Sequence, residues 1–190
     1  MPLTIPNILT LLRIVLIPLF VGIFYFERSW VSLANQNLVA TVIFTLAAVT
    51  DWFDGWLARK LDQTSAFGAF LDPVADKLLV ASGLILLVQF QRVAVWLAIV
   101  MIAREMIVTG ARVVAAKEGF VVPADSLGKF KVIGQIGGIL CLILQGVWVQ
   151  SEGPLATVGT GLLYIALFFS LFSGWRYLMQ IFKKISPQYW

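Results

Sequence analysis

The sequence predicts an all-α integral membrane protein with six transmembrane helices. Hydrophobic residues make up 60% of its 190 residues and charged residues only 13%, whereas a soluble domain is nearer half apolar and a quarter charged. The mean hydropathy is +0.92, and the apolar residues form six segments of about the 20 residues that a helix needs to cross a bilayer. Little sequence remains for a soluble domain, so we expect one membrane-embedded domain over residues 1–190.

Polar or turn-forming residues separate the six apolar segments. Pro73 follows Asp72 and suits the first turn of the third helix. A short loop over residues 61–72 makes the second and third helices antiparallel neighbours. The expected helices cover residues 7–26, 38–60, 73–90, 93–116, 127–150 and 155–182.

Four aspartates lie close together in the stretch 51–76, namely Asp51, Asp54, Asp72 and Asp76. Ionisable groups at membrane depth are costly and usually functional. Asp51 and Asp54 lie within about 60° of each other on the second helix, and Asp72 and Asp76 are one turn apart at the start of the third. Since these helices are expected neighbours, the four carboxylates can converge at one end of the bundle.

The residue types on offer indicate which ion this cluster binds. The chain has no histidine and a single cysteine, so the ligands are oxygens, which select hard divalent ions such as Mg²⁺ or Mn²⁺. We therefore expect a site for two such ions. Structural roles stay open for single residues, because Asp72 suits a helix N-cap before Pro73 and Asp51 or Asp54 can pair with Arg59.

Small residues and an arginine surround the aspartates. Small side chains let a bulky ligand approach the backbone, although they also allow close helix packing. Arg59, one turn after Gly55, can neutralise a phosphate or anchor at the headgroups. Divalent ions and an arginine together favour a diphosphate ligand. The small residues are Gly55, Ala58, Ala66, Gly68 and Ala69.

The spacing of these residues resembles the signature of the CDP-alcohol phosphotransferase family. The pattern D-x2-D-G-x2-A-R-x8-G-x3-D-x3-D is matched at all eight fixed positions of residues 51–76. Residues 5–13, 103–107 and 126–131 are similar to members whose acceptor is glycerol 3-phosphate, although Val132 stands where many relatives have threonine. The resemblance implies six membrane spans, with the signature on the second and third.

The resemblance also implies an activity and a set of site residues. A phosphatidyl group would pass from CDP-diacylglycerol to sn-glycerol 3-phosphate, giving phosphatidylglycerophosphate and CMP, a step of phospholipid biosynthesis. The metal ligands would be Asp51, Asp54, Asp72 and Asp76, and Asp76 would also be the general base. The expected CDP-diacylglycerol contacts are Asn7, Thr10, Gly55, Ala58, Arg59, Ser65 and Gly68, of which the first two are alternatively helix-start residues.

An anionic acceptor requires cations, which the chain carries after residue 100. The candidates for binding the acceptor phosphate are Arg104, Arg112, Lys129 and Lys131. Other roles stay open, because Arg104 can pair with Glu105 or an aspartate and the two lysines can be cytoplasmic anchors. Members of the family that make cardiolipin, phosphatidylinositol or phosphatidylserine differ in the acceptor, so they remain alternatives.

Basic residues are distributed unevenly between the two ends of the expected helices. With six helices, both termini lie on the side of the 61–72 and 117–126 loops, and only Arg28 and Arg92 of the fourteen Lys and Arg residues fall on the other. Because basic residues accumulate on the cytoplasmic side, we expect the termini and the aspartates to face the cytoplasm, and the family resemblance implies that the membrane is a bacterial inner membrane. The net charge of +4 favours membrane lipids over nucleic acid as partners.

Two other classes of protein also use clustered carboxylates in membranes. A divalent-cation transporter lines its path with acids, but here the acids crowd one end and no polar series crosses the bilayer. An intramembrane prenyltransferase also binds Mg²⁺ and a diphosphate, but on well-separated helices of a longer chain.

A G-x3-G motif at Gly134 and Gly138 lies in the fifth helix. Small residues at this spacing let helices approach closely, either within one chain or between two chains. The motif leaves both possibilities open, and the family resemblance favours a homodimer.

Overall fold

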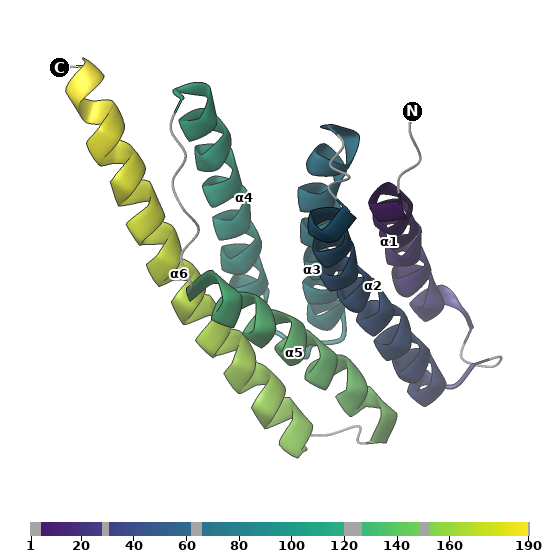
Figure 1. The fold of residues 1–190 in the computed structure, drawn as a ribbon. Coiled ribbons are helices and arrows are strands. Elements are labelled where there is room, and N and C mark those ends of the chain that lie inside the picture. The colour runs from purple at the N-terminus through teal and green to yellow at the C-terminus, as the bar shows by residue number, and fades with distance from the viewer. Residues whose placement is uncertain (1–4, 28–30, 62–65, 120–126, 149–152, 190) are drawn as a thin grey trace.

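The computed structural model is a bundle of long α-helices (Figure 1). It describes residues 5–27, 31–61, 66–119, 127–148 and 153–189, without the side chains of 5–6, 52, 54–61, 66–67, 69–70, 127, 129, 148 and 184–189. These ranges hold six α-helices and one 3₁₀ turn, and no strand occurs in them, which confirms the all-α prediction. The elements are α1 (Ile5–Gly22), η1 (Ile23–Tyr25), α2 (Leu33–Leu61), α3 (Ala66–Gln89), α4 (Val95–Lys117), α5 (Leu127–Trp148) and α6 (Pro154–Tyr189).

The largest differences from the predicted boundaries are the end of α6, at Tyr189 rather than residue 182, and the start of α3. The helix begins at Ala66 rather than at residue 73, so Asp72 and Pro73 lie inside it. The prediction that Pro73 occupies the first turn is therefore wrong, and so is the N-cap role considered for Asp72. The apolar residues before Pro73 continue the helix because backbone groups in a membrane must be satisfied internally, and one proline removes only one such bond.

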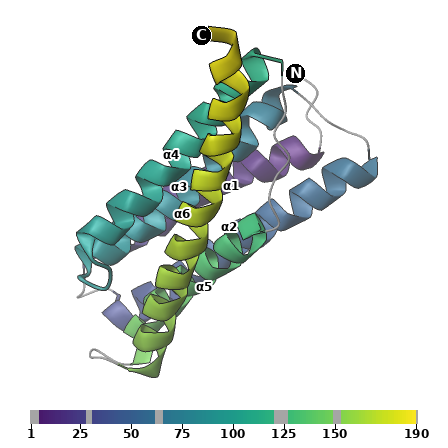
Figure 2. The same ribbon diagram turned by 90° about the vertical axis from the view of Figure 1, so that its left-hand side faces the viewer.

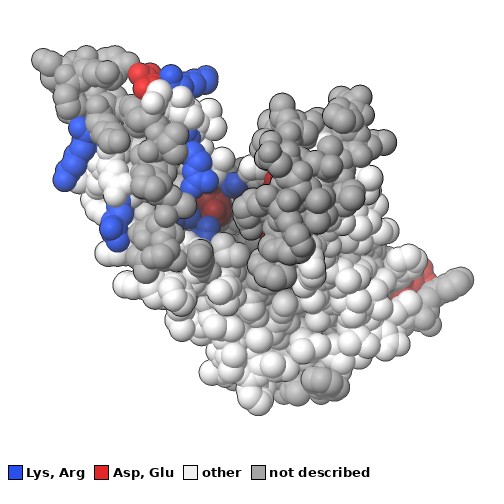
Figure 3. Space-filling model, viewed as in Figure 1, with Lys and Arg blue, Asp and Glu red and all other residues white. Residues whose placement is uncertain are grey.

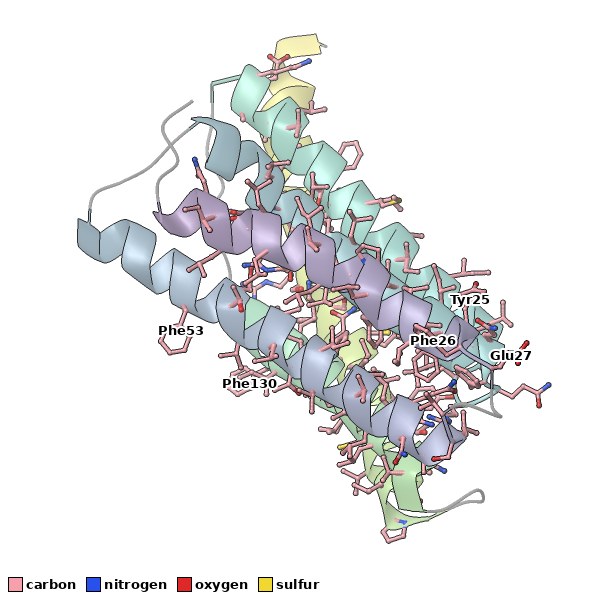
Figure 4. All side chains as sticks on the ribbon, turned by 90° about the vertical axis from the view of Figure 1, so that its right-hand side faces the viewer. Tyr25, Phe26, Glu27, Phe53 and Phe130 are labelled. Atoms are coloured by element: carbon pink, nitrogen blue, oxygen red, sulfur yellow. The ribbon has the colours of Figure 1, made fainter. Side chains whose placement is uncertain are left out.

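Several helices in the described part of the chain have the length and composition of membrane spans. Four stretches meet both criteria: Asn7–Tyr25, Leu33–Asp51, Phe130–Val147 and Pro154–Lys183. The other two long helices, α3 and α4, have 24 and 23 residues, enough for a span, but carry charged residues along their length. Large apolar side chains cover the outside, and Figure 4 shows Phe53 and Phe130 projecting away from the helices. Such a surface suits contact with lipid.

Helix packing divides the bundle into two sides that are joined at one end. Helix α2 lies between α1 and α5, α5 packs along α6, and α4 contacts α3 and α6. Figures 1 and 2 show the start of α1 and the end of α6 at the same end of the bundle. The buried side chains that join the helices include Phe20, Phe44, Leu84, Met101 and Ile139. The charged residues of α2 to α5 lie outside this core, toward the end of the bundle at which α6 ends.

The G-x3-G motif packs α5 against α6 within the chain. A Cβ atom added to Gly138 would lie 2.8 Å from the Leu163 side chain and 2.9 Å from the carbonyl oxygen of Gly159. A Cβ atom on Gly134 would lie 3.2 Å from that of Ala166. The intrachain alternative is therefore the one that the structure supports for this motif.

Replacing Gly138 by alanine is expected to destabilise the protein. The added methyl group meets the backbone of α6, and overpacking of this kind costs about 1–3 kcal/mol. The midpoint of thermal unfolding in detergent measures the effect. The matched control is Gly161→Ala in α6, where an added Cβ atom meets nothing within 4 Å and alanine is a better helix former. Equal midpoints for the two variants would contradict the packing role of Gly138.

Arg92 ties the helices together at the end opposite to the aspartates. It follows α3, and its Nη1 donates to Asn37 Oδ1 at 2.8 Å and to the carbonyl oxygen of Leu142 at 3.0 Å. Its guanidinium also lies 5.4 Å from the ring centroid of Phe90, and Gly146 leaves room for it. Because Asn37 belongs to α2 and Leu142 to α5, one side chain connects the end of α3 with two other helices.

Candidate active site

Helix α1 presents a buried polar face to the two helices that carry the aspartates. Asn7, Thr10 and Arg13 follow one another at three-residue spacing and are all buried. Thr10 Oγ1 donates a short hydrogen bond to Asp72 Oδ1. Arg13 Nη1 forms an ion pair of 2.5 Å with Asp51 Oδ1. Helix α1 thus contacts the aspartates of both α2 and α3.

The described aspartates lie inside α2 and α3 rather than at their ends, since Asp51 precedes the end of α2 by ten residues and Asp72 and Asp76 follow the start of α3 by six and ten. The negative charges of Asp51 and Asp72 act on each other, and that of Asp51 also acts on Asp76. The side chain of Asp54 lies outside the described residues. Among the acids that the structure does describe, no three come close enough together to hold one metal ion. The four-aspartate metal site stays a prediction.

The donor chemistry of this region fits a hard divalent cation. The described oxygen donors of this region are the carboxylates of Asp51, Asp72 and Asp76 and the hydroxyl of Thr10, which contacts Asp72. Mg²⁺ and Mn²⁺ prefer donors of this kind. Partly buried carboxylates that repel one another are stabilised by nearby cations, and Arg13 supplies one positive charge beside Asp51.

The structure describes some of the residues that are predicted to contact the CDP moiety. Asn7 and Thr10 are both buried, and the hydrogen bond of Thr10 to Asp72 shows that Thr10 interacts across helices rather than only within its own first turn. Gly68 is buried in the first turn of α3. The side chains of Gly55, Ala58 and Arg59 in α2 and the whole of Ser65 lie outside the described residues.

A charged cavity of about 380 Å³ lies between α3, α4, α5 and α6. Asp76 lines it together with Arg104, Arg112 and Lys131, three of the four cations predicted to bind an acceptor. The side chain of the fourth, Lys129, lies outside the described residues. Figure 3 shows basic side chains around an acidic one in this hollow. The cavity therefore places several basic side chains beside the predicted general base.

Two residues of α6 in this cavity escaped the sequence analysis. Arg176 lines it, and Tyr177 lies beneath Arg112, whose guanidinium carbon is 5.7 Å from the ring centroid. The sequence could have pointed to Arg176, because it is the only charged residue between positions 155 and 182.

The alternative role of Arg104 is present in the structure as well. Its Nη1 lies 3.1 Å from Glu105 Oε1, and its Nη2 donates to Ser173 Oγ at 2.8 Å. Lys131 Nζ makes a short ion pair with the same Glu105 oxygen. These contacts leave Arg104 and Lys131 in the cavity wall, so ion pairing with Glu105 and a position beside Asp76 occur together.

A second, mainly apolar cavity of about 280 Å³ lies between α3, α4 and α5. Its lining includes Leu78, Ile102, Met106 and Ile136. The two cavities share one wall, formed by Asp76, Lys77, Glu105, Thr109 and Lys131. The predicted base therefore stands between an apolar space and a charged one.

Comparison with known proteins identifies the family of this arrangement. The model of the CDP-alcohol phosphatidyltransferase family matches residues 3–179. The chain belongs to this family. The chain is 42% identical over 188 residues to a Bacillus subtilis (strain 168) protein, covering 95% of this chain and 96% of the relative. It is 40% identical over 190 residues to a protein of Yersinia enterocolitica, covering 97% and 98% of the two chains.

Both of these CDP-alcohol phosphatidyltransferases carry the name CDP-diacylglycerol–glycerol-3-phosphate 3-phosphatidyltransferase. A Salmonella typhimurium protein with the same name is 39% identical over 184 residues, which is 94% of each chain. Membership confirms the resemblance that the aspartate signature indicated and identifies a membrane-bound transferase. Catalysis in the family depends on divalent cations.

Arg13 is a further site residue that sequence analysis missed. It is completely buried and pairs with Asp51. The signal that points to it is the spacing of Asn7, Thr10 and Arg13, which places three polar residues on one face of an apolar helix.

Replacing Arg13 by methionine is expected to lower activity by about ten- to a hundredfold, the usual effect of removing a partner that orients a metal ligand. The rate of CMP release measures this, and a higher Mg²⁺ concentration should recover part of it. Lys117→Met, at the exposed end of α4, is the control. A rate for Arg13→Met equal to that of the control would contradict the orienting role.

Proposed function

We propose that this protein transfers the phosphatidyl group of CDP-diacylglycerol to sn-glycerol 3-phosphate, giving phosphatidylglycerophosphate and CMP. The observation that carries the proposal is the charged cavity, in which Arg104, Arg112 and Lys131 lie beside Asp76. An acceptor that carries a phosphate needs such cations, whereas an uncharged alcohol does not. The names of the relatives support the same acceptor.

Two divalent ions, Mg²⁺ or Mn²⁺, are the proposed cofactors. Asp51, Asp54, Asp72 and Asp76 would hold them. When bound, the ions balance the charge of the substrate diphosphate and favour the departure of CMP. Within the protein, Arg13 and Thr10 hold the carboxylates of Asp51 and Asp72 in place.

The proposed role of Asp76 follows from its position in the cavity wall. Its carboxylate accepts the proton of the acceptor hydroxyl, whose oxygen forms a bond to the phosphorus that carries the lipid. The bond between that phosphorus and the oxygen bridging to CMP breaks, and CMP leaves with the electron pair. An aspartate is a weak base at neutral pH, so the placement of the hydroxyl supplies much of the effect.

The remaining predicted residues would bind the substrates. The cytidine diphosphate would lie against Asn7, Thr10, Gly55, Ala58, Arg59, Ser65 and Gly68, and the acceptor phosphate against Arg104, Arg112, Lys129 and Lys131. The proximity of Thr10 to Asp72 supports the first group. The cavity supports the second, since its surface collects positive charge next to the base.

We further propose one domain over residues 1–190 in a bacterial inner membrane, with the site and both termini toward the cytoplasm. The family match over residues 3–179 supports a single domain. The excess of basic residues near the site supports the orientation. A homodimer is proposed from the family resemblance alone, because Gly134 and Gly138 pack against α6 of the same chain.

The acceptor is tested by CMP release from purified, detergent-solubilised protein with CDP-diacylglycerol and Mg²⁺. Glycerol 3-phosphate, inositol, serine and phosphatidylglycerol are supplied separately. CMP should appear with glycerol 3-phosphate alone. CMP with a different acceptor would keep the family and overturn the proposed acceptor. Folded protein that releases no CMP with any of the four would overturn the transferase activity and favour divalent-cation transport.

A further inference from the structure

Glu105 occupies an unusual place in the charged cavity. Among the side chains that the structure describes, five cationic ones line this cavity, namely Lys77, Arg104, Arg112, Lys131 and Arg176, and two acidic ones, Asp76 and Glu105. Asp76 belongs to the aspartate signature, whereas Glu105 does not. Glu105 is therefore a second negative charge in a mainly basic surface, and it has no role in the reaction proposed above.

The contacts of Glu105 join two of the cations. One carboxylate oxygen, Oε1, accepts from Lys131 Nζ on α5 and from Arg104 Nη1 on its own helix, the latter at 3.1 Å. The three side chains are largely buried, with 12% of Lys131 and of Arg104 and 19% of Glu105 exposed. Charges at this depth are weakly screened, so two such cations would repel each other without the carboxylate between them.

The carboxylate of Asp76 interacts electrostatically with members of the same group of charges. The negative charge of Glu105 and the positive charge of Lys131 both act on its carboxylate. Glu105 and Lys131 also belong to the wall that separates the charged cavity from the apolar one. The position of this ion pair therefore sets where an anion can lie relative to Asp76.

We propose that Glu105 is a positioning residue of the acceptor cavity. Its carboxylate holds Arg104 and Lys131 at one point beside Asp76, and it weakens the cavity's affinity for anions by neutralising part of their charge. This inference rests on the proposed function for the meaning of the site, but not for its test. The ligand class is a phosphate group, carried by the acceptor or free in solution.

The decisive variant is Glu105→Gln, which keeps the size of the side chain and removes its charge. Inorganic phosphate is the probe, and binding is measured as the rise in the thermal unfolding midpoint of the detergent-solubilised protein, against chloride at equal ionic strength. The variant should bind phosphate about three- to tenfold more tightly than the unaltered protein. In the CMP assay its kcat should fall at least tenfold, while the KM for glycerol 3-phosphate does not rise.

Two further variants separate charge from position. Glu105→Asp keeps the charge but shortens the side chain, so phosphate affinity should stay unchanged while kcat falls. Glu118→Gln removes an exposed glutamate just after α4 and should change neither quantity.

Phosphate binding by Glu105→Gln that is no tighter than in the unaltered protein would overturn the inference. So would an unchanged kcat, or a lower unfolding midpoint with unaltered phosphate affinity, which marks a purely structural residue. If the unaltered protein uses an acceptor other than glycerol 3-phosphate, the proposed function fails and the phosphate measurement still decides the role of Glu105. If the unaltered protein binds no phosphate, the inference fails and the acceptor assay still stands.

Discussion

Replacing Asp76 by asparagine is expected to reduce the rate of CMP release by about a thousandfold or more. General base catalysis alone contributes about 10²- to 10⁴-fold, and the same carboxylate is a proposed metal ligand. Asparagine keeps the shape of the side chain but can neither accept the proton nor carry the charge. The assay contains CDP-diacylglycerol, Mg²⁺ and saturating glycerol 3-phosphate, so the change appears in kcat.

The control for this variant is Glu118→Gln, which removes one negative charge from an exposed position outside both cavities. It should retain the unaltered rate. The Asp76→Asn protein should unfold at no lower temperature than the unaltered protein, since losing one of several repelling carboxylates costs little. A residual rate within tenfold of the unaltered protein would show that Asp76 is not the base.

Removing divalent cations is expected to abolish activity, and adding Mg²⁺ or Mn²⁺ should restore it. The described oxygens of Asp51, Asp72, Asp76 and Thr10 suit such ions. If two ions act together, the rate should rise more steeply than in proportion to Mg²⁺ at low concentration. Protein treated with EDTA and then dialysed supplies the starting point, with its metal content checked by mass spectrometry.

Two comparisons make the metal experiment specific. Arg13→Met should need more Mg²⁺ than the unaltered protein for half its maximal rate, because Asp51 loses the side chain that orients it. Lys117→Met should need the same concentration as the unaltered protein. Full activity in protein shown to be free of divalent metal would refute the metal site.

The helices and their order were predictable because membrane burial leaves a strong pattern in sequence. Each apolar segment of span length became one helix, and most ends agree within five residues. The exceptions are the start of α3, at Ala66 rather than residue 73, and the end of α6, at Tyr189 rather than residue 182. A proline usually marks a helix start or a break, but the apolar residues 66–71 extend α3 past it. The rule failed there because leaving several backbone groups without hydrogen bonds in a membrane costs more free energy than placing one proline inside a helix.

The site was predictable in part, and its remaining features depend on how the helices face one another. The spacing placed the aspartates on the second and third helices, but the structure has them inside α2 and α3 rather than at the helix ends. The pairing of Arg13 with Asp51 and the entry of Arg176 into the cavity depend on the rotation and tilt of α1 and α6, which no local pattern specifies. The contact between Lys131 and Glu105 joins residues 26 positions apart on different helices, for the same reason.

Arg92 fixes one end of α3, so a tilt of this helix would move its other end most. The hydrogen bonds of Arg92 to Asn37 and Leu142 fasten the end of α3 to α2 and α5, and Asp76 lies roughly 20 Å further along α3, at 1.5 Å per residue. A tilt of about 5° around the fastened end therefore moves Asp76 by roughly 2 Å, while the residues around Arg92 hardly move. A tilt of this kind would therefore displace Asp76, which lines both cavities, more than the residues near Arg92. A substitution at Arg92 would loosen the pivot and change turnover from the far end of the molecule.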